Sequence, residues 1–188
     1  MVVYDTIIIN LFCGPGGGKS TMAARVFADL KELGINAELV TEYAKDLTWQ
    51  RSLHVLENQL YIFAKQHHRI WRVFGKVDVI VTDSPYLMGL AYAQNASEHF
   101  KNLIVEEHRK HNSINVFLQR VKPYNPIGRN QDEAGARELD RIIQETVAPY
   151  LEFDMRIKGE KASAQEIVNL ALLRLRDKGP DISKLKEQ

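Results

Sequence analysis

The residues whose types and spacing could do chemistry begin with the run CGPGGGKST at positions 13–21. Glycines let a backbone curl around phosphate groups with several N–H groups pointing inward, and a helix that begins just after them favours an anion. The run follows the pattern G-x-x-x-x-G-K-[ST], except that Cys13 stands at the first glycine position. A glycine-rich turn without a ligand is the alternative. We expect ATP to be bound by Gly14, Pro15, Gly16, Gly17, Gly18, Lys19, Ser20 and Thr21.

Within this run the two side chains that follow the glycines have separate roles. Lys19 is expected to reach the β- and γ-phosphate oxygens, and Ser20 is expected to offer its hydroxyl to Mg²⁺. The Cys13 thiol is predicted to be structural, because a small buried thiol is more common than a reactive one.

Two carboxylates each follow an apolar run and could act on the same phosphates. Glu42 follows the second run and Asp83 follows the third. Because ligands of α/β sheets bind at the carboxyl ends of the strands, we expect both acids near the loop. Asp83 is predicted to hold Mg²⁺ with Ser20, and Glu42 is our leading general base. A loose phosphoryl-transfer transition state asks little of a base, so which acid removes the proton stays open. Helix capping is the alternative role for both acids, with Pro85 in the first turn after Asp83.

A second group of residues, between Tyr43 and Phe74, could bind the acceptor of a phosphoryl group. Tyr43 and Trp49 follow Glu42 and could form walls for a planar base. Apolar residues recur at a spacing of three to four residues from Leu47 to Phe74, which predicts a core-facing helical stripe. Gln59 and Arg69 lie beside that stripe and could bind a base edge or a phosphate. A solvated helix face is the alternative.

Arginines are spread over a Pro/Gly-containing segment and the helical run that follows it. Arg120, Arg129 and Arg137 could neutralise charge on a phosphoryl group during transfer. The spacing predicts a lid over about residues 120–137, with Arg129 catalytic and the other two in contact with substrate. A surface salt bridge to Glu133 or another nearby acid is the alternative for Arg137.

The elements that must position these residues follow from alternating apolar runs and helix-length segments. Strand-length apolar runs occur at Thr6 to Phe12, Ala37 to Thr41, Val77 to Thr82 and Ile114 to Leu118. Such runs are typical of strands buried on both faces of a parallel sheet. A weaker fifth strand is predicted at Asp154 to Ile157, and a last helix from Ser163 to about Arg176. The fold class is therefore predicted to be α/β, a three-layer P-loop NTPase sandwich with a five-stranded parallel sheet and an arginine-bearing lid.

Length and composition limit the alternatives. The chain has 188 residues, of which 45% are hydrophobic and 26% charged, as expected for one globular domain. We predict a kinase domain over residues 1–178 and a flexible tail over residues 179–188.

The net charge of +1 implies no global electrostatic field that would attract nucleic acid. One cysteine and no signal-peptide pattern predict a cytoplasmic protein, and no apolar run is long enough to cross a membrane. Two histidine pairs lack completing ligands, so no structural metal is predicted.

Several nucleotide-binding classes fit the sequence poorly. The base-reading Asn-Lys-x-Asp string of a switch GTPase does not occur. An oligomeric motor ATPase normally carries a further helical subdomain, for which 188 residues leave little room. A kinase fits the size, because it needs an acceptor site and a lid on the same domain.

Taken together, these segments resemble the nucleoside and nucleotide kinases of the thymidylate-kinase-like P-loop class. The resemblance covers most of the chain and rests on the run at 13–21, on Glu42 with Tyr43, on Asp83-Ser84-Pro85 and on the segment from Arg120 to Arg129. The stretch TEYAKDLTW at positions 41–49 is most similar to small bacteriophage-encoded kinases, including those that phosphorylate 5-hydroxymethyluracil in phage DNA during thymine hypermodification. The resemblance implies that ATP phosphorylates the hydroxymethyl group of the base, which later enzymes displace.

The resemblance implies hydroxymethyluracil-containing DNA as the partner and, for a phage-encoded protein, the host cytoplasm as the location. A local cluster of Lys65, Arg69 and Arg72 with Trp71 is compatible with DNA, although a solvated basic face is the alternative. A kinase of free deoxynucleosides or deoxynucleoside monophosphates remains the second reading. A nucleotide-binding regulator without catalysis is the third, and the oligomeric state is not predicted.

Overall fold

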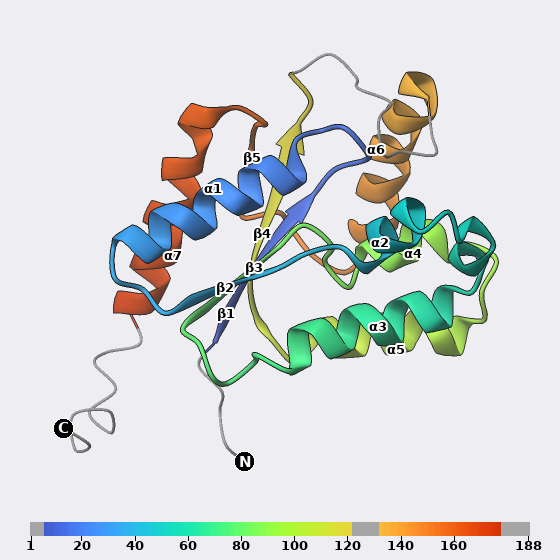
Figure 1. The fold of residues 1–188 in the computed structure, drawn as a ribbon, viewed down its shortest axis with the longest axis horizontal. Helices are drawn as coiled ribbons and strands as arrows, with labels where there is room; N and C mark the ends of the chain where they lie inside the picture. The colour runs from blue at the N-terminus through green and yellow to red at the C-terminus, as the bar shows by residue number, and fades with distance from the viewer. Residues whose placement is uncertain (1–5, 122–131, 178–188) are drawn as a thin grey trace.

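The computed structural model of the chain describes residues 6–121 and 132–177. A five-stranded parallel sheet with the order β2-β3-β1-β4-β5 lies at its centre (Figure 1). The strands are β1 (Ile7–Phe12), β2 (Ala37–Val40), β3 (Val79–Thr82), β4 (Asn112–Gln119) and β5 (Met155–Lys158). Each predicted apolar run therefore forms a strand, with ends that differ by a few residues.

Helices cover both faces of the sheet, as Figure 1 shows. They are α1 (Lys19–Glu32), α2 (Tyr43–Trp49), α3 (Gln59–Trp71), α4 (Met88–Tyr92), α5 (Glu98–Arg109), α6 (Glu133–Val147) and α7 (Ala164–Arg176), with short 3₁₀ turns η1 (Leu53–Glu57) and η2 (Lys161–Ser163). Alternate β1 residues point to opposite faces. Ile7 and Ile9 pack into a core with α1 and α7, and Ile8 packs into a second core with α3 to α6. The predicted three-layer sandwich is confirmed.

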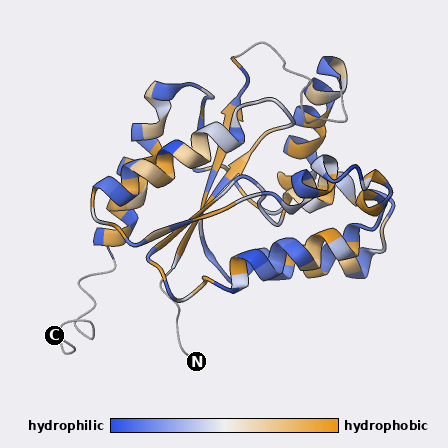
Figure 2. Cartoon of the chain, in the orientation of Figure 1, coloured by the Kyte–Doolittle hydropathy of each residue, from blue (hydrophilic) through white to orange (hydrophobic). Residues whose placement is uncertain are grey.

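The hydropathy of the residues follows this layering (Figure 2). The strands are coloured as hydrophobic along most of their length, whereas the helices alternate between hydrophobic and hydrophilic residues. In the described part of the chain, none of the helices has the length and apolar character needed to cross a membrane.

The register of the sheet brings three loop segments to one edge. Thr82 of β3 lies beside Asn10 of β1 and beside Val40 of β2. Strands β2 and β3 therefore end level with each other, and β1 continues only to Phe12, so Glu42, Asp83 and the glycine-rich loop all lie at this carboxyl edge.

The segment predicted as one helical stripe is divided in two by a turn. Helix α2 ends at Trp49, and Arg51 then adopts a left-handed conformation with φ of 58°. Helix α3 begins after Asn58, whose side chain accepts a hydrogen bond from the Tyr61 N–H group. The apolar stripe is buried at Leu47 in α2 and at Phe63 and Ile70 in α3. The stripe is interrupted between them, where Leu53 in η1 and Leu60 at the start of α3 are exposed.

Two further predictions lie outside the described residues. Arg129 and most of the predicted lid belong to residues 122–131, and the tail at 179–188 belongs to the C-terminal end. Both therefore stay predictions.

Candidate active site

The glycine-rich loop joins β1 to α1 and depends on glycine at specific positions. Gly16 and Gly18 have φ angles of 78° and 98°, in the left-handed region that favours glycine. A Cβ atom at Gly17 would lie 2.3 Å from the Cys13 sulfur, so the thiol occupies the space that a side chain there would need. Cys13 itself is not among the residues with positive φ, so its position does not require glycine. This explains how the loop accommodates a cysteine at the first position of the pattern.

The Cys13 thiol is fully buried below the loop. Burial raises the pKa of this thiol, and the charge of Lys19 opposes that shift only in part. A neutral buried thiol is a poor nucleophile, which agrees with a structural role.

Lys19 lies at the start of α1 with its ammonium group against the loop. Its Nζ atom donates hydrogen bonds to the carbonyl oxygens of Cys13, at 2.5 Å, and Gly14, at 3.2 Å. The first four N–H groups of a helix have no intrahelical partner, so the start of α1 offers donors and a positive charge to a phosphate group.

Asp83 and Ser20 form the part of the site suited to a divalent cation. The Ser20 hydroxyl donates a 2.5 Å hydrogen bond to Oδ2 of Asp83, which β3 places beside the loop. Asp83 is buried, and its Oδ1 atom has no hydrogen-bond partner in the described residues. An orphaned carboxylate oxygen beside a hydroxyl fits Mg²⁺, which takes one or two carboxylates together with substrate phosphates. Helix α4 starts at Met88 with Leu87 as its N-cap, so the alternative that Asp83 caps a helix is wrong.

Glu42 occupies the N-cap position of α2, but its side chain makes no capping hydrogen bond. It faces the cavity described below. Burial raises the pKa of the Glu42 carboxyl above its usual range, and the nearby Lys19 charge opposes this only in part. A carboxyl group with a raised pKa that makes no capping bond is suited to take up a proton.

A cavity of about 590 Å³ opens beside the glycine-rich loop. The loop side contributes Gly16, Lys19 and Ser20, and the opposite side is mostly apolar and aromatic. That side is lined from α2, η1, α3, α4 and α5 by residues that include Trp49, Leu56, Gln59, Ile62, Phe63, Tyr86, Met88, Tyr92, Phe100 and Ile104. The volume and lining are typical of a site for a small organic molecule with one planar part.

Among the predicted acceptor residues, Trp49 and Gln59 line the cavity, whereas Tyr43 and Arg69 do not. Arg69 forms an ion pair with Asp46, donates to the Thr41 carbonyl at 3.1 Å and lies over the Tyr43 ring. The Tyr43 hydroxyl is 3.0 Å from that of Tyr61. These side chains therefore bind one another beside the cavity, a placement that differs from the expected one.

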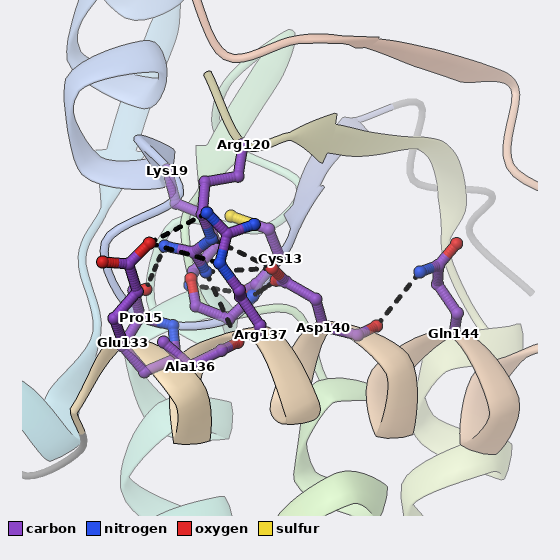
Figure 3. Close-up of polar contacts among 10 residues, drawn as sticks. Cys13, Pro15, Lys19, Arg120, Glu133, Ala136, Arg137, Asp140 and Gln144 are labelled. Carbon is purple, nitrogen blue, oxygen red and sulfur yellow. Dashed lines mark hydrogen bonds and ion pairs between the residues drawn. The ribbon is translucent and has the colours of Figure 1, made fainter. Parts of the chain in front are cut away.

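The arginines of the predicted lid also differ in placement, as Figure 3 shows for two of them. The Arg120 guanidinium is buried and bound to Asp140 and to the Pro15 carbonyl. Arg137 forms an exposed i,i+4 ion pair with Glu133 at 2.8 Å, which matches the alternative of a surface salt bridge. Neither of these two arginines lines the cavity.

Further residues of the site are not among those predicted from the sequence. Gln66 is buried, accepts a hydrogen bond from the Tyr43 N–H group at 2.9 Å and lines the cavity. Tyr92 lines the cavity from the end of α4. Tyr86 had the clearest signal, since it directly follows the Asp83-Ser84-Pro85 segment.

Comparison with known proteins gives one family. Residues 8–152 match the family model described as AAA domain, which covers the loop, both acids and the cavity walls. No curated protein is a significant match.

Solved structures with a similar fold include two kinases. A deoxyadenosine kinase from M. mycoides with bound dATP is 17% identical, with 90% of this chain and 99% of that chain covered and a TM-score of 0.49. A shikimate kinase from Aquifex aeolicus is 18% identical, with 90% and 96% covered and a TM-score of 0.47. Because both TM-scores are below 0.5, any functional assignment must rest on the residues of the site itself.

Proposed function

The chain belongs to the AAA domain family of P-loop proteins, and from this premise we propose that it is an ATP-dependent phosphotransferase with an alcohol group as acceptor. The observation that carries the proposal is the cavity beside the glycine-rich loop. An ATPase that uses water needs no apolar chamber of this size next to the terminal phosphate. A kinase needs one, because the acceptor must be held in line and water excluded.

The chemistry divides among the residues of the loop, the two acids and the acceptor. The loop N–H groups and Lys19 bind the phosphates, and Ser20 with Asp83 would hold Mg²⁺, which neutralises charge on the phosphates when bound. The acceptor oxygen forms a bond to the γ-phosphorus while the bond from that phosphorus to the bridging oxygen breaks, and ADP leaves. Glu42 takes the proton of the acceptor hydroxyl. Arg129 stays our predicted catalytic arginine.

For the acceptor, the leading proposal is the hydroxymethyl group of 5-hydroxymethyluracil in DNA, which the family resemblance implies. The aromatic lining contributed by Phe63, Tyr86 and Trp49 supports a planar base in the cavity. Trp49 is 64% exposed at the cavity wall, so it is accessible to a base that enters from solvent.

A free deoxynucleoside or its monophosphate is the second candidate, and one observation favours it. The basic cluster that could hold DNA is partly neutralised, because Arg69 is paired with Asp46 and lies over the Tyr43 ring. Arg69 is therefore less available to a DNA phosphate than a free surface arginine.

The acceptor is tested with ATP labelled at the γ-phosphate and a panel of acceptors. The panel contains free nucleosides, monophosphates, linear unmodified DNA, and covalently closed circular DNA with and without hydroxymethyluracil. Label on the hydroxymethylated circle supports base phosphorylation, since a circle has no end to phosphorylate. Label only on free nucleosides or monophosphates replaces the leading acceptor with the second, and label only on linear DNA ends indicates an end kinase.

A further inference from the structure

The first half of the glycine-rich loop is held by side chains from distant parts of the chain (Figure 3). The Gly14 N–H group donates to Oδ1 of Asp140 on α6. Arg120, just after β4, donates to the Pro15 carbonyl at 2.7 Å and to Oδ2 of Asp140 through Nε at 3.1 Å and a terminal nitrogen at 2.9 Å. One carboxylate therefore binds both the loop backbone and the arginine that binds the next loop residue.

This pair differs from the other ion pairs of α6 in its burial. The side chains of Arg120 and Asp140 are 4% and 18% exposed, whereas those of Arg141 and Glu138 are 56% and 53% exposed. A charge-assisted pair away from water, here with two guanidinium nitrogens on one carboxylate oxygen, is strong and fixes geometry, whereas an exposed pair contributes little. Burying two charges is also costly. Such a pair therefore often fixes the positions of the groups that it joins without adding to the free energy of unfolding.

The fit between α6 and the loop is close at Gly14. A Cβ atom there would lie 2.5 Å from the Ala136 carbonyl oxygen and 2.9 Å from Asp140 Oδ1. The backbone of α6 therefore contacts the loop directly, and a change in the position of α6 must move the loop or break the contact.

The second half of the loop has a different task. Its N–H groups, from Gly16 into the first turn of α1, are those that the sequence pattern assigns to phosphates. With Gly14 and Pro15 fixed from outside, the loop keeps one conformation, and binding of a nucleotide does not have to order it.

We propose that Asp140, acting through Gly14 and Arg120, is a positioning residue for nucleotide binding. Through it, the position of α6 and the affinity for ATP are linked, and the linkage is reciprocal: ATP binding stabilises α6 as α6 stabilises the loop. This inference rests on nucleotide binding in the proposed function and is independent of the acceptor.

The test compares Asp140→Ala, Asp140→Asn and Arg120→Ala with the wild type, and uses Arg141→Ala on the exposed face of α6 as control. The dissociation constant for Mg-ATP is measured by calorimetric titration. Loss of a hydrogen bond to a charged partner changes an equilibrium constant roughly 10- to 100-fold, which is the loss expected for Asp140→Ala. Asp140→Asn retains an oxygen for Gly14 but loses the charge facing Arg120, so it should show a smaller loss. The control should bind ATP as the wild type does.

Two double variants separate positioning from general stability. Arg120→Ala leaves an unpaired carboxylate near the phosphates, so adding Asp140→Ala to it should restore part of the affinity. The exchange of the two residues, Arg120→Asp with Asp140→Arg, should not restore affinity, because the Gly14 N–H group would then face an arginine.

Hydrogen exchange supplies a readout that a merely structural role would not change. In the wild type, ATP should slow amide exchange in α1 and in α6. In Asp140→Asn at saturating ATP, α1 should still be protected and the extra protection of α6 should be lost. Wild-type affinity in both Asp140 variants, or unchanged α6 protection, would overturn the inference while leaving the proposed function intact. A wild-type chain that binds no ATP would overturn both.

Discussion

The two walls of the cavity are built in opposite ways. The phosphate wall is one continuous run of nine residues, positions 13–21, and works mainly through its backbone. The acceptor wall is assembled from side chains on α2, η1, α3, α4 and α5. A site made of backbone requires particular residues at fixed local spacing, whereas a site made of side chains requires only that the core pack around it. The first kind can be identified from the sequence, and the second needs the fold.

The largest effect should come from the phosphate wall. Lys19→Ala removes the charge nearest the transferred group and should lower kcat by about 10³-fold, as expected for loss of a main electrostatic contact in a phosphoryl-transfer site. The fold should be unchanged, because Lys19 Nζ bonds only to loop carbonyls among the described residues. Steady-state kinetics with a far-ultraviolet circular dichroism control measures both. Near-normal turnover would show that the loop is not the phosphate site.

The next effect concerns the cation. Asp83→Asn keeps the size of the side chain and its bond to Ser20, but removes the ligand charge, so kcat should fall by about 10²-fold and more Mg²⁺ should be needed. A magnesium titration of the rate at saturating ATP measures this. An unchanged titration would leave Asp83 as only a hydrogen-bond partner of Ser20.

The fold could be predicted almost completely, because buried parallel strands need continuous apolar runs. Each strand lies within a predicted run or within a few residues of one, and α7 begins one residue after its predicted start. The exception was the region around Arg51, where a left-handed turn divides the predicted stripe. Nothing in the apolar spacing indicates such a turn, since Leu53 and Leu60 continue the period although both are exposed.

The arginines explain why the acceptor side could not be predicted in the same way. A sequence shows that an arginine is present but not which carboxylate it meets. Arg69 meets Asp46, and Arg120 meets Asp140, which is 20 positions away. The partners follow from helix packing, so their pairing becomes visible only in the folded chain.

A third prediction lies at the boundary between the two walls and uses pH. If Glu42 accepts the proton, it works only when ionised, so kcat should rise as the pH passes upward through its raised pKa. Glu42→Gln should lower kcat by about 10²-fold at alkaline pH and remove this acid limb. The native state binds the Glu42 proton more tightly than the unfolded state does. Ionisation of Glu42 therefore lowers the free energy of unfolding as the pH rises. Glu42→Gln should therefore also raise the melting temperature at pH 8. A rate equal to that of the wild type at all pH values would remove Glu42 from the mechanism.

The smallest effect should come from the acceptor wall. Trp49 is 64% exposed and lines the cavity, so its removal leaves the core unchanged. Stacking on an aromatic side chain contributes about 1–3 kcal/mol per base, so Trp49→Ala should raise KM for a planar acceptor by about tenfold. The KM for ATP should not change. With a free nucleoside as acceptor, for which the basic cluster around Trp71 has no DNA to bind, Trp71 is the matched control, because it is equally exposed at the end of α3 and is not part of the cavity lining. Equal effects of the Trp49→Ala and Trp71→Ala changes would show that the wall does not bind the acceptor.

The central claim is that the cavity holds an acceptor that takes the phosphoryl group in place of water. The most direct measurement is a single-turnover reaction with enzyme in excess over ATP labelled at the γ-phosphate, run with and without the acceptors of the panel. The account predicts that, with the right acceptor, the label moves to an acceptor hydroxyl and little appears as inorganic phosphate. Label that appears only as inorganic phosphate, at the same rate with and without every acceptor, would contradict it and make the chain an ATPase.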